Sequence, residues 1–339
     1  MAHVYGVTIR KGGQGKSTTV SMLARLCALY GARVLVVDLA QPGTSTASLR
    51  DLWPAGEHGE LSGALLAFQS VAAGAMPDPD EVRRAFDGAH LPVTLASLPS
   101  WSGGCVRVLP WDELLGDAAA FLHSERVLAG LLAAMRDETD VVLVDFPADS
   151  GPLLTNAVLA TDAVLMPLVP ETPALEGLEA TLRLLARARA AGHPITLAGI
   201  LLTHCDPKNK RCADIVNTIR IAGTVEGESL AEKLYPFAIK QSEFYEQAFR
   251  YGGPIWERTP NPSHWIGYVL LAERILRDAG LPVVRRGPAL QIAPNTPILE
   301  TSALMLGDPE VSMADFERVH AAFGFSIPAG DAAPRKDVP

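Results

Sequence analysis

The chain has few cysteines, and their spacing excludes the sites that cysteines most often build. Its 339 residues include four, Cys27, Cys105, Cys205 and Cys212, and each stands alone in the sequence. Disulfide-stapled scaffolds need many paired cysteines, and zinc or iron–sulfur sites need CxxC-like spacing. We therefore expect reduced thiols and neither a zinc nor an iron–sulfur centre.

An excess of positive charge is also absent. Lysine and arginine number 29 against 38 acidic residues, which gives a formal net charge of −9. A uniformly basic nucleic-acid-binding protein is thereby excluded. Any contact with DNA must come from a local basic patch.

Long apolar runs are missing too. No stretch reaches the length of about 18 residues that a membrane-spanning helix needs. The first residues lack the basic, apolar and small-residue pattern of a signal peptide. The last stretch, Pro328–Pro339, has too few basic residues and too many prolines for an amphipathic membrane helix. We expect a cytoplasmic protein without membrane attachment.

Short apolar runs alternate with helical patterns along most of the chain. This alternation predicts an α/β fold of crossover units, with a mainly parallel twisted sheet and helices on both faces. Runs such as Val34–Val37 and Val141–Val144 are apolar throughout, which is typical of strands buried on both faces. The predicted strands are Val4–Ile9, Arg33–Leu39, Pro92–Leu98, Asp140–Phe146, Ala163–Leu168, Ile195–Thr203 and Leu234–Ile239. The predicted helices are Lys16–Tyr30, Ser124–Arg136, Leu153–Ala160, Leu175–Ala191, Cys212–Ile221, Glu243–Arg250 and Ser263–Ala279.

Two stretches interrupt this alternation. Residues 51–91 contain proline- and glycine-rich turns, which indicate a variable excursion of loops and short helices. We predict one domain over residues 1–284 and a C-terminal extension over 285–339. The extension is expected to hold one short helix, Ser312–Gly324, and a frayed tail.

The most informative segment is a glycine-rich loop between a predicted strand and a predicted helix. It reads Lys11-Gly12-Gly13-Gln14-Gly15-Lys16-Ser17-Thr18. Glycines let successive backbone N–H groups turn toward a phosphate, and the following helix adds its positive end. The Lys16 ammonium would reach the β- and γ-phosphates, and the Ser17 hydroxyl would complete a Mg²⁺ shell. We therefore predict that Gly12 to Thr18 bind a nucleotide.

This loop departs from the standard GxxxxGK[ST] form, because Arg10 stands at the first glycine and Lys11 opens the loop. The resulting KGGxGK[ST] pattern resembles the deviant Walker A ATPases of the ParA/Soj/MinD group. The resemblance extends over residues 1–280 and implies a P-loop NTPase fold with ATP and Mg²⁺ as cofactors. In that group the early lysine crosses to the phosphates bound by the partner subunit. The resemblance thus implies an ATP-dependent homodimer, in which Lys11 and Lys16 stabilise the transferred charge.

Three carboxylates extend the resemblance. Asp38 ends the second predicted strand and matches the first acid of the group's second motif. Asp145 ends the strand Val141–Val144 and looks like the Walker B carboxylate, which holds Mg²⁺ through water. Asp149 falls in the switch region that senses the γ-phosphate. The resemblance implies catalytic roles for Asp38 and Asp149 and a metal site formed by Ser17 and Asp145.

The later part of the chain also follows the group in order and spacing. The segment Pro167–Glu171, followed by a helix, and the segment Gly199–Thr203 both resemble partition ATPases. On this basis Thr203, His204 and a loop at Pro236 are expected to lie beside the adenine.

One position departs from the group's DxDPQGN motif in a way that matters for chemistry. Here the chain reads Asp38-Leu39-Ala40-Gln41-Pro42-Gly43-Thr44, so Ala40 replaces the acid that orients the attacking water. A methyl side chain cannot accept a hydrogen bond. Slow hydrolysis is expected, unless Gln41 or Asp149 orients the water instead.

These observations indicate a ParA-like ATPase that acts in DNA partition or cargo positioning. The resemblance implies nonspecific DNA binding, a nucleoid-associated location, and a ParB-like or adaptor protein that stimulates hydrolysis. The basic residues that could contact DNA are Arg183, Arg187, Arg189, Lys208, Lys210, Arg211, Arg220, Arg274, Arg277, Arg285 and Arg286. Two alternatives stay open: an ATP-gated scaffold with negligible hydrolysis, and a metabolic P-loop ligase related to the cobyrinate amidases and dethiobiotin synthetases.

Overall fold

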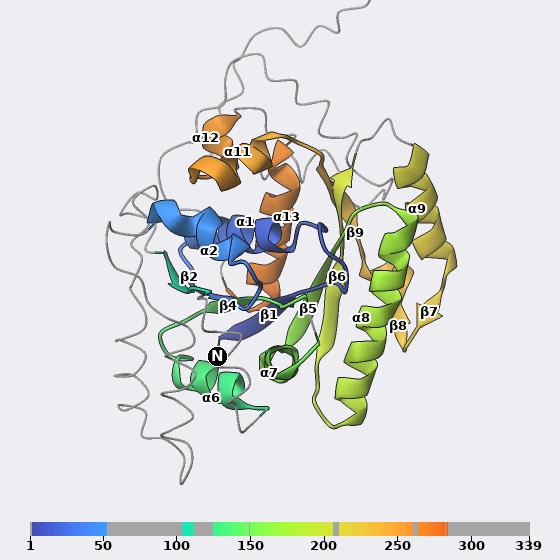
Figure 1. The fold of residues 1–339 in the computed structure, drawn as a ribbon, viewed down its shortest axis with the longest axis horizontal. Coiled ribbons are helices and arrows are strands. Elements are labelled where there is room, and N and C mark those ends of the chain that lie inside the picture. Colours follow the sequence, from blue (N-terminus) through green and yellow to red (C-terminus); the bar gives the residue numbers. More distant parts are fainter. Residues whose placement is uncertain are drawn as a thin grey trace, which may run out of the picture.

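A seven-stranded sheet forms the centre of the molecule (Figure 1). The computed structural model describes residues 2–52, 104–111, 125–148, 150–205, 210–259, 264–281 and 283. The strands of the sheet are β1 (His3–Val7), β2 (Arg33–Asp38), β3 (Cys105–Leu109), β4 (Val141–Asp145), β5 (Ala163–Leu168), β6 (Thr196–Cys205) and β9 (Leu234–Lys240). Their order is β3-β2-β4-β1-β5-β6-β9, and all neighbouring pairs are parallel. The predicted parallel sheet is confirmed.

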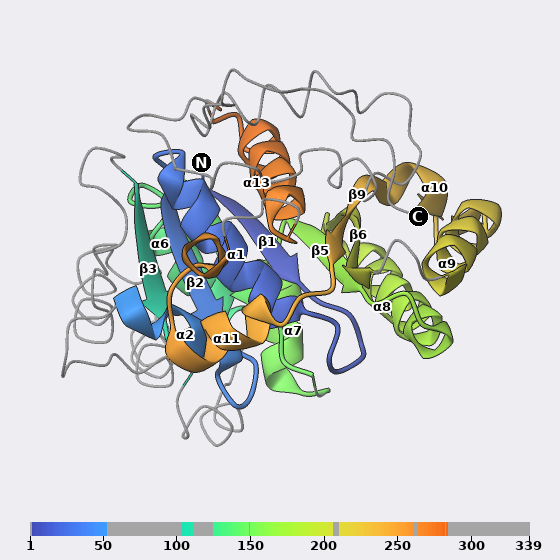
Figure 2. The same cartoon turned by 90° about the horizontal axis from the view of Figure 1, so that it is seen from above.

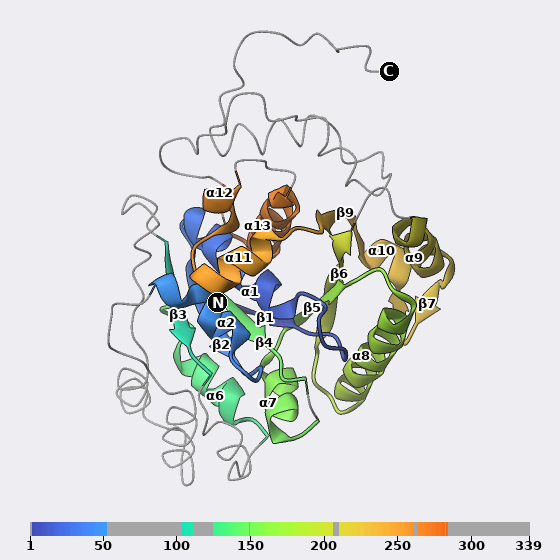
Figure 3. The same ribbon diagram turned by 45° about the horizontal axis from the view of Figure 1, so that its top comes forward.

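Helices cover both faces of this sheet (Figures 1 and 3). On one face lie α1 (Lys16–Leu29) and α13 (Ile266–Asp278). The same face carries the smaller elements α2 (Thr44–Leu49), η1 (Arg50–Leu52), α11 (Phe244–Tyr251) and α12 (Ile255–Arg258). On the other face lie α6 (Val127–Ala134), α7 (Pro152–Ala160), α8 (Thr172–Ala190) and α9 (Lys210–Ile221). A short hairpin, β7 (Thr224–Val225) and β8 (Glu228–Ser229), leads into α10 (Leu230–Lys233). No helix within the described ranges has both the length and the apolar character needed to cross a membrane.

The apolar core has two layers because the strands are buried on both faces. Along β2, Val34 and Val36 face the layer that holds α1 and α13. Leu35 and Val37 face the layer that holds α6, α7 and α8. Alternate side chains of a strand point to opposite faces. An unbroken apolar run is therefore what a strand covered by helices on both sides requires.

The direction in which successive strands are added to the sheet changes at β1, in its centre. β1 lies between β4 and β5, and the chain fills the β2 side of the sheet before it turns to the β5, β6 and β9 side. In open α/β sheets ligands bind outside the carboxyl ends of the strands at such a switch point. The loop from Lys11 to Gly15 lies there, between the end of β1 and the start of α1.

Several predicted elements need correction or lie outside the description. The edge strand Cys105–Leu109 and the helix Thr44–Leu49 were not predicted. The predicted strand Pro92–Leu98, the excursion from residue 53 to 91, and the extension 285–339 with its helix Ser312–Gly324 lie outside the described residues. The domain limits therefore stay predictions.

Candidate functional site

The loop after β1 has the backbone shape that its glycines predict. Gly13 and Gly15 take left-handed conformations, with φ of 72° and 79°, and α1 begins at Lys16 directly afterwards. Nothing in the described chain lies within 4 Å of the position where a Cβ on Gly12 or Gly13 would stand. The loop can therefore approach a ligand closely with its backbone N–H groups at the positive end of α1.

A backbone N–H and a hydroxyl near the ends of two other strands hold this loop in place. The Val169 N–H, just after β5, donates to Gln14 Oε1 at 2.9 Å. The Thr203 hydroxyl, on β6, donates to the Gln14 carbonyl at 3.0 Å. The Gln14 and Thr203 side chains are both buried. Gln14 and Thr203, predicted to bind nucleotide, thus shape the loop through these side-chain contacts.

Lys16 supplies a half-buried positive charge at the start of α1. Its ammonium donates to the Lys11 carbonyl at 3.3 Å. Burial lowers the pKa of Lys16, and the nearby Asp145 carboxylate opposes this shift. A half-buried ammonium of this kind is stabilised by a bound anion, and phosphate groups are suited to that role.

Two carboxylates face this charge from neighbouring strands. Asp38 ends β2, Asp145 ends β4, and the two residues are partners in the parallel register. Both are fully buried. Burial raises the pKa of Asp38 to about 7, and the Asp145 charge acts in the same direction. Burial also raises the pKa of Asp145, whereas the Ser17 and Ser45 hydroxyls and the Lys16 charge lower it. Two buried acids this close need a compensating cation to stay ionised together.

The two carboxylates differ in what they bind. Asp38 accepts hydrogen bonds from the Thr46 N–H and hydroxyl, both at 2.7 Å, and from the Ala40 N–H at 3.1 Å. The Asp145 Oδ2 accepts one from the Ser45 hydroxyl at 2.6 Å. Its Oδ1 is buried and has no hydrogen-bond partner within the described chain. Asp38 therefore anchors the loop from Ala40 to Thr46, and Asp145 keeps one oxygen available to a ligand.

The residues at Asp145 fit a hydrated Mg²⁺. A free carboxylate oxygen and the Ser17 hydroxyl are the hard oxygen donors that Mg²⁺ prefers, and this ion commonly completes its shell with water and phosphate oxygens. Among the described residues there is no group of three or more His, Cys, Asp or Glu side chains that could hold a metal ion by themselves. The donor set therefore fits a metal that arrives together with a nucleotide.

The loop after β2 contains site residues that sequence reasoning missed. Ser45 and Thr46 supply the hydroxyls that bind Asp145 and Asp38. Gly43 has a φ of 81° and packs against the Trp111 side chain. The available signal was the run of hydroxyl residues that follows a strand ending in an acid. Ala40 is buried at the start of this loop, where its methyl group offers no hydrogen-bonding atom.

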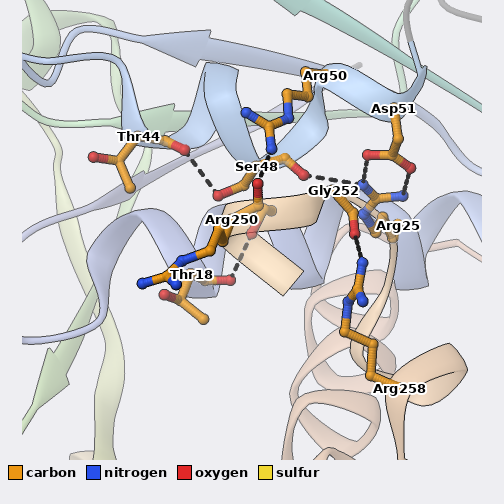
Figure 4. Close-up of polar contacts among 10 residues, drawn as sticks. Thr18, Arg25, Thr44, Ser48, Arg50, Asp51, Arg250, Gly252 and Arg258 are labelled. Carbon is orange, nitrogen blue, oxygen red and sulfur yellow. Dashed lines mark hydrogen bonds and ion pairs between the residues drawn. The ribbon is translucent and has the colours of Figure 1, made fainter. Parts of the chain in front are cut away.

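Behind this loop, arginines fasten α2 and η1 to the rest of the protein (Figure 4). The buried Arg25 of α1 forms a two-pronged ion pair with Asp51 and donates to the Ser48 carbonyl at 3.0 Å. Arg50 donates to the Arg250 carbonyl at the end of α11. Figure 2 shows α11 lying beside α2. The segment that follows the Asp38 loop is thereby tied to α1 and to α11.

The early lysine has a partner in its own chain. The Lys11 ammonium lies 3.7 Å from a carboxylate oxygen of Glu171, the residue before α8, and both side chains are partly exposed. The ion pair places the ammonium at the surface of the glycine-rich loop from Lys11 to Gly15, which we call the phosphate loop.

The remaining predicted residues do not all converge. His204 is exposed at the end of β6 and has a left-handed φ of 51°. Pro236 lies inside β9, so the predicted Pro236 loop is wrong as a loop. Asp149 lies outside the described residues. The adenine contacts at Thr203, His204 and Pro236 stay predictions.

Within the described ranges, the basic residues expected to contact DNA do not all lie on one face of the sheet. Arg183, Arg187 and Arg189 lie on α8, whereas Arg274 and Arg277 lie on α13, across the sheet. Lys208, Arg285 and Arg286 lie outside the described residues. Four of the described arginines have carboxylate partners in the chain: Arg183, Arg189, Arg274 and Arg277.

Comparison with known proteins agrees with this geometry. Residues 5–232 match the CobQ/CobB/MinD/ParA nucleotide binding domain. The chain is 30 % identical over 269 residues to the chromosome-partitioning ATPase Soj of Thermus thermophilus, which covers 79 % of this chain and 92 % of Soj. A structure of Cyanthece apo McdA superposes with a TM-score of 0.62 at 21 % identity, over 80 % of this chain and 99 % of McdA.

A second solved structure adds a cofactor to the comparison. Cobyrinic acid a,c-diamide synthase from Mycobacterium smegmatis, with bound ATP analogue and magnesium, has a TM-score of 0.58 at 23 % identity, over 82 % of this chain and 95 % of the synthase. The two superpositions, at identities below 25 %, show the shared fold alone. The family match and the similarity to Soj show that the chain belongs to the CobQ/CobB/MinD/ParA nucleotide-binding domain family and, within it, to the ParA/Soj-like partition ATPases.

Proposed function

We propose that the protein is an ATP-dependent, dimerising ParA-like ATPase that binds DNA nonspecifically and acts in DNA partition or cargo positioning. The observation that carries this proposal is the buried Asp145, one oxygen of which has no hydrogen-bond partner among the described residues and lies in a site with Ser17 and Lys16 at the phosphate loop. Bound Mg²⁺ would neutralise charge that develops on the phosphates. Lys16 would stabilise the same charge, and Ser17 with Asp145 would hold the ion.

The dimer depends on Lys11. In the single chain its ammonium pairs with Glu171 at a partly exposed position, and exposed ion pairs contribute only about 0–1 kcal/mol. The ammonium is therefore available to phosphates bound by a second copy. ATP-dependent dimerisation is expected to be lost on Lys11→Ala, while the monomer still binds ATP.

The test is the mass in solution with ADP, with ATP and with a nonhydrolysable analogue. A dimer is expected with the last two ligands only. Arg274→Ala, which removes an exposed charge on α13, is the matched control and should dimerise like the natural protein. A monomer under all three conditions would contradict the dimer, and a Lys11→Ala dimer would remove the role of Lys11.

Slow turnover follows from Ala40. Replacing it by Asp restores a proton acceptor at the start of the loop that Asp38 anchors, so Ala40→Asp is expected to accelerate single-turnover hydrolysis. Ala40→Asn has nearly the same size without the charge and should remain slow. Equal rates in all three proteins would mean that another residue orients the water.

DNA binding through phosphates predicts an affinity that falls steeply with salt. Arg187 is exposed on α8, so Arg187→Glu should weaken binding at every DNA sequence. Arg274→Glu makes the same charge reversal on α13, on the other face of the sheet, so the variant that loses more affinity identifies the face that contacts DNA. If ATP-loaded protein ignores DNA at low salt, this part of the proposal is wrong.

A second candidate is an ATP-gated scaffold with negligible hydrolysis, which the Ala40 position favours. ATP recovered intact from the purified protein would support it. Rapid multiple turnover with a partner protein would exclude it.

A further inference from the structure

Two thiols meet at the carboxyl end of β6. Cys205 is the last residue of this strand, and Cys212 lies in the first turn of α9. They are seven positions apart in sequence, and the Cys212 thiol donates to the Cys205 sulfur at 3.1 Å. Because a disulfide bond is about 2.0 Å long, the sulfurs need to approach by only about 1 Å to be joined.

The surroundings of the two thiols assign them different roles. Cys212 is 7 % exposed and Cys205 only 1 %. The close contact with Cys212 and burial both raise the pKa of Cys205 well above the usual thiol value. Cys212 is therefore the thiol that a small oxidant meets first, and Cys205 is the thiol that resolves the product.

The pair is close to the phosphate loop. Two residues before Cys205, the Thr203 hydroxyl holds the Gln14 carbonyl of that loop at 3.0 Å. The Cys205 carbonyl accepts a hydrogen bond from the Gln241 N–H at 2.9 Å, which ties the end of β6 to the end of β9. A covalent link at Cys205 therefore restrains the strand end that supports the loop.

We propose that Cys205 and Cys212 are a redox modification site that closes into an intramolecular disulfide, with a peroxide as the oxidant. Hydrogen peroxide oxidises the Cys212 thiol to a sulfenic acid and leaves as water. The Cys205 sulfur then attacks the sulfenic sulfur, the S–S bond forms, and the hydroxide leaves with the Cys205 proton as a second water. The two thiols lose two electrons and two protons in total, which the peroxide accepts. A dithiol such as dithiothreitol reverses the step by exchange.

The modification is tested on the full chain without nucleotide. After peroxide treatment, mass spectrometry of an unreduced digest is expected to show a Cys205–Cys212 cross-link lighter by two hydrogen atoms, which dithiothreitol removes. Cys212→Ser should abolish the cross-link, and Cys105→Ser, which alters a half-buried thiol on β3, should leave it unchanged. Thiols that stay unlinked, or that proceed to sulfinic acids, would overturn the proposal.

Its consequence for the ligand rests on the proposed nucleotide-binding function. A restrained β6 end should slow release of a fluorescent ATP analogue several-fold in the oxidised protein, and Cys212→Ser should show no dependence on oxidation. Equal release rates before and after cross-linking would overturn this consequence. If the reduced protein binds no nucleotide at all, the proposed function fails, and the cross-link result stands separately.

Discussion

The ends of β2 and β4 lie side by side, and each carries a buried aspartate, but the two carboxylates differ in their hydrogen bonding. Asp38 is surrounded by donors from the loop that follows it, whereas Asp145 has one oxygen bound by Ser45 and one without a partner in the described chain. Both are fully buried. The difference teaches that a buried acid beside a phosphate loop is not by itself a catalytic group. Hydrogen-bond saturation separates the acid that holds the protein together from the acid that is free to act on a ligand.

The sharpest way to break this comparison is Asp38→Ala. The substitution strands the Thr46 and Ala40 N–H donors in a buried place, and each stranded donor costs about 1–3 kcal/mol. We expect the free energy of unfolding to fall by about 2–4 kcal/mol, measured by urea unfolding followed by circular dichroism. Unchanged stability would show that Asp38 does not anchor the loop.

Asp145→Asn should give the opposite outcome. It removes a buried charge, one oxygen of which has no hydrogen-bond partner in the described part of the chain, so stability without ligand should stay equal or rise. Mg²⁺-dependent ATP affinity should fall by about 10- to 100-fold, the usual range for residues that orient a bound metal. The measurement is calorimetric titration with and without Mg²⁺. Loss of stability together with intact Mg²⁺ dependence would reverse the assignments of the two acids.

The hydroxyls of Thr46 and Ser45, which bind the two carboxylates, allow the same comparison with smaller expected effects. Thr46→Val keeps the side-chain shape but removes the hydroxyl that donates to Asp38 and that accepts from the backbone N–H of Trp111 at 3.0 Å. We expect a loss of about 1–2 kcal/mol in the free energy of unfolding and little change in Mg²⁺ affinity. A shift in Mg²⁺ affinity alone would place Thr46 in the metal site.

Ser45→Ala is expected to have the smallest effect. Without the Ser45 hydroxyl the Asp145 carboxylate loses the contact that fixes its orientation, so Mg²⁺ affinity should fall by less than about 10-fold. The same titration measures it, with Ser48→Ala on α2 as the control. A stability loss larger than that of Thr46→Val would contradict the separation of roles within this loop.

Most of the sheet could be predicted from the sequence because its strands are short apolar runs covered on both sides. The predicted strand Ala163–Leu168 matches β5 at both ends. The strand Cys105–Leu109 was missed because it is only five residues long and has a charged residue at its centre, Arg107, which pairs with Glu138 at 2.9 Å. It forms the edge of the sheet, where the sequence signal is weaker.

The candidate site divides in the same way. The phosphate loop, Lys16 and Asp145 follow from local patterns, since a glycine-rich turn and a strand ending in an acid are visible in the sequence. The role of Ser45 does not, because it depends on contact between segments 100 positions apart. The helix Thr44–Leu49 has a composition of weak helix formers and depends on the buried Arg25, which binds its Ser48 carbonyl.

The two hydrogen bonds that grip Gln14 carry a consequence for selectivity. The contacts from Val169 and Thr203 order the phosphate loop before any ligand binds, so ligand binding does not bear the entropic cost of ordering it. A loop held in this way would contact only the phosphates of the proposed nucleotide, so it would bind adenine and guanine nucleotides equally well. Discrimination between the two bases must then reside beyond the loop.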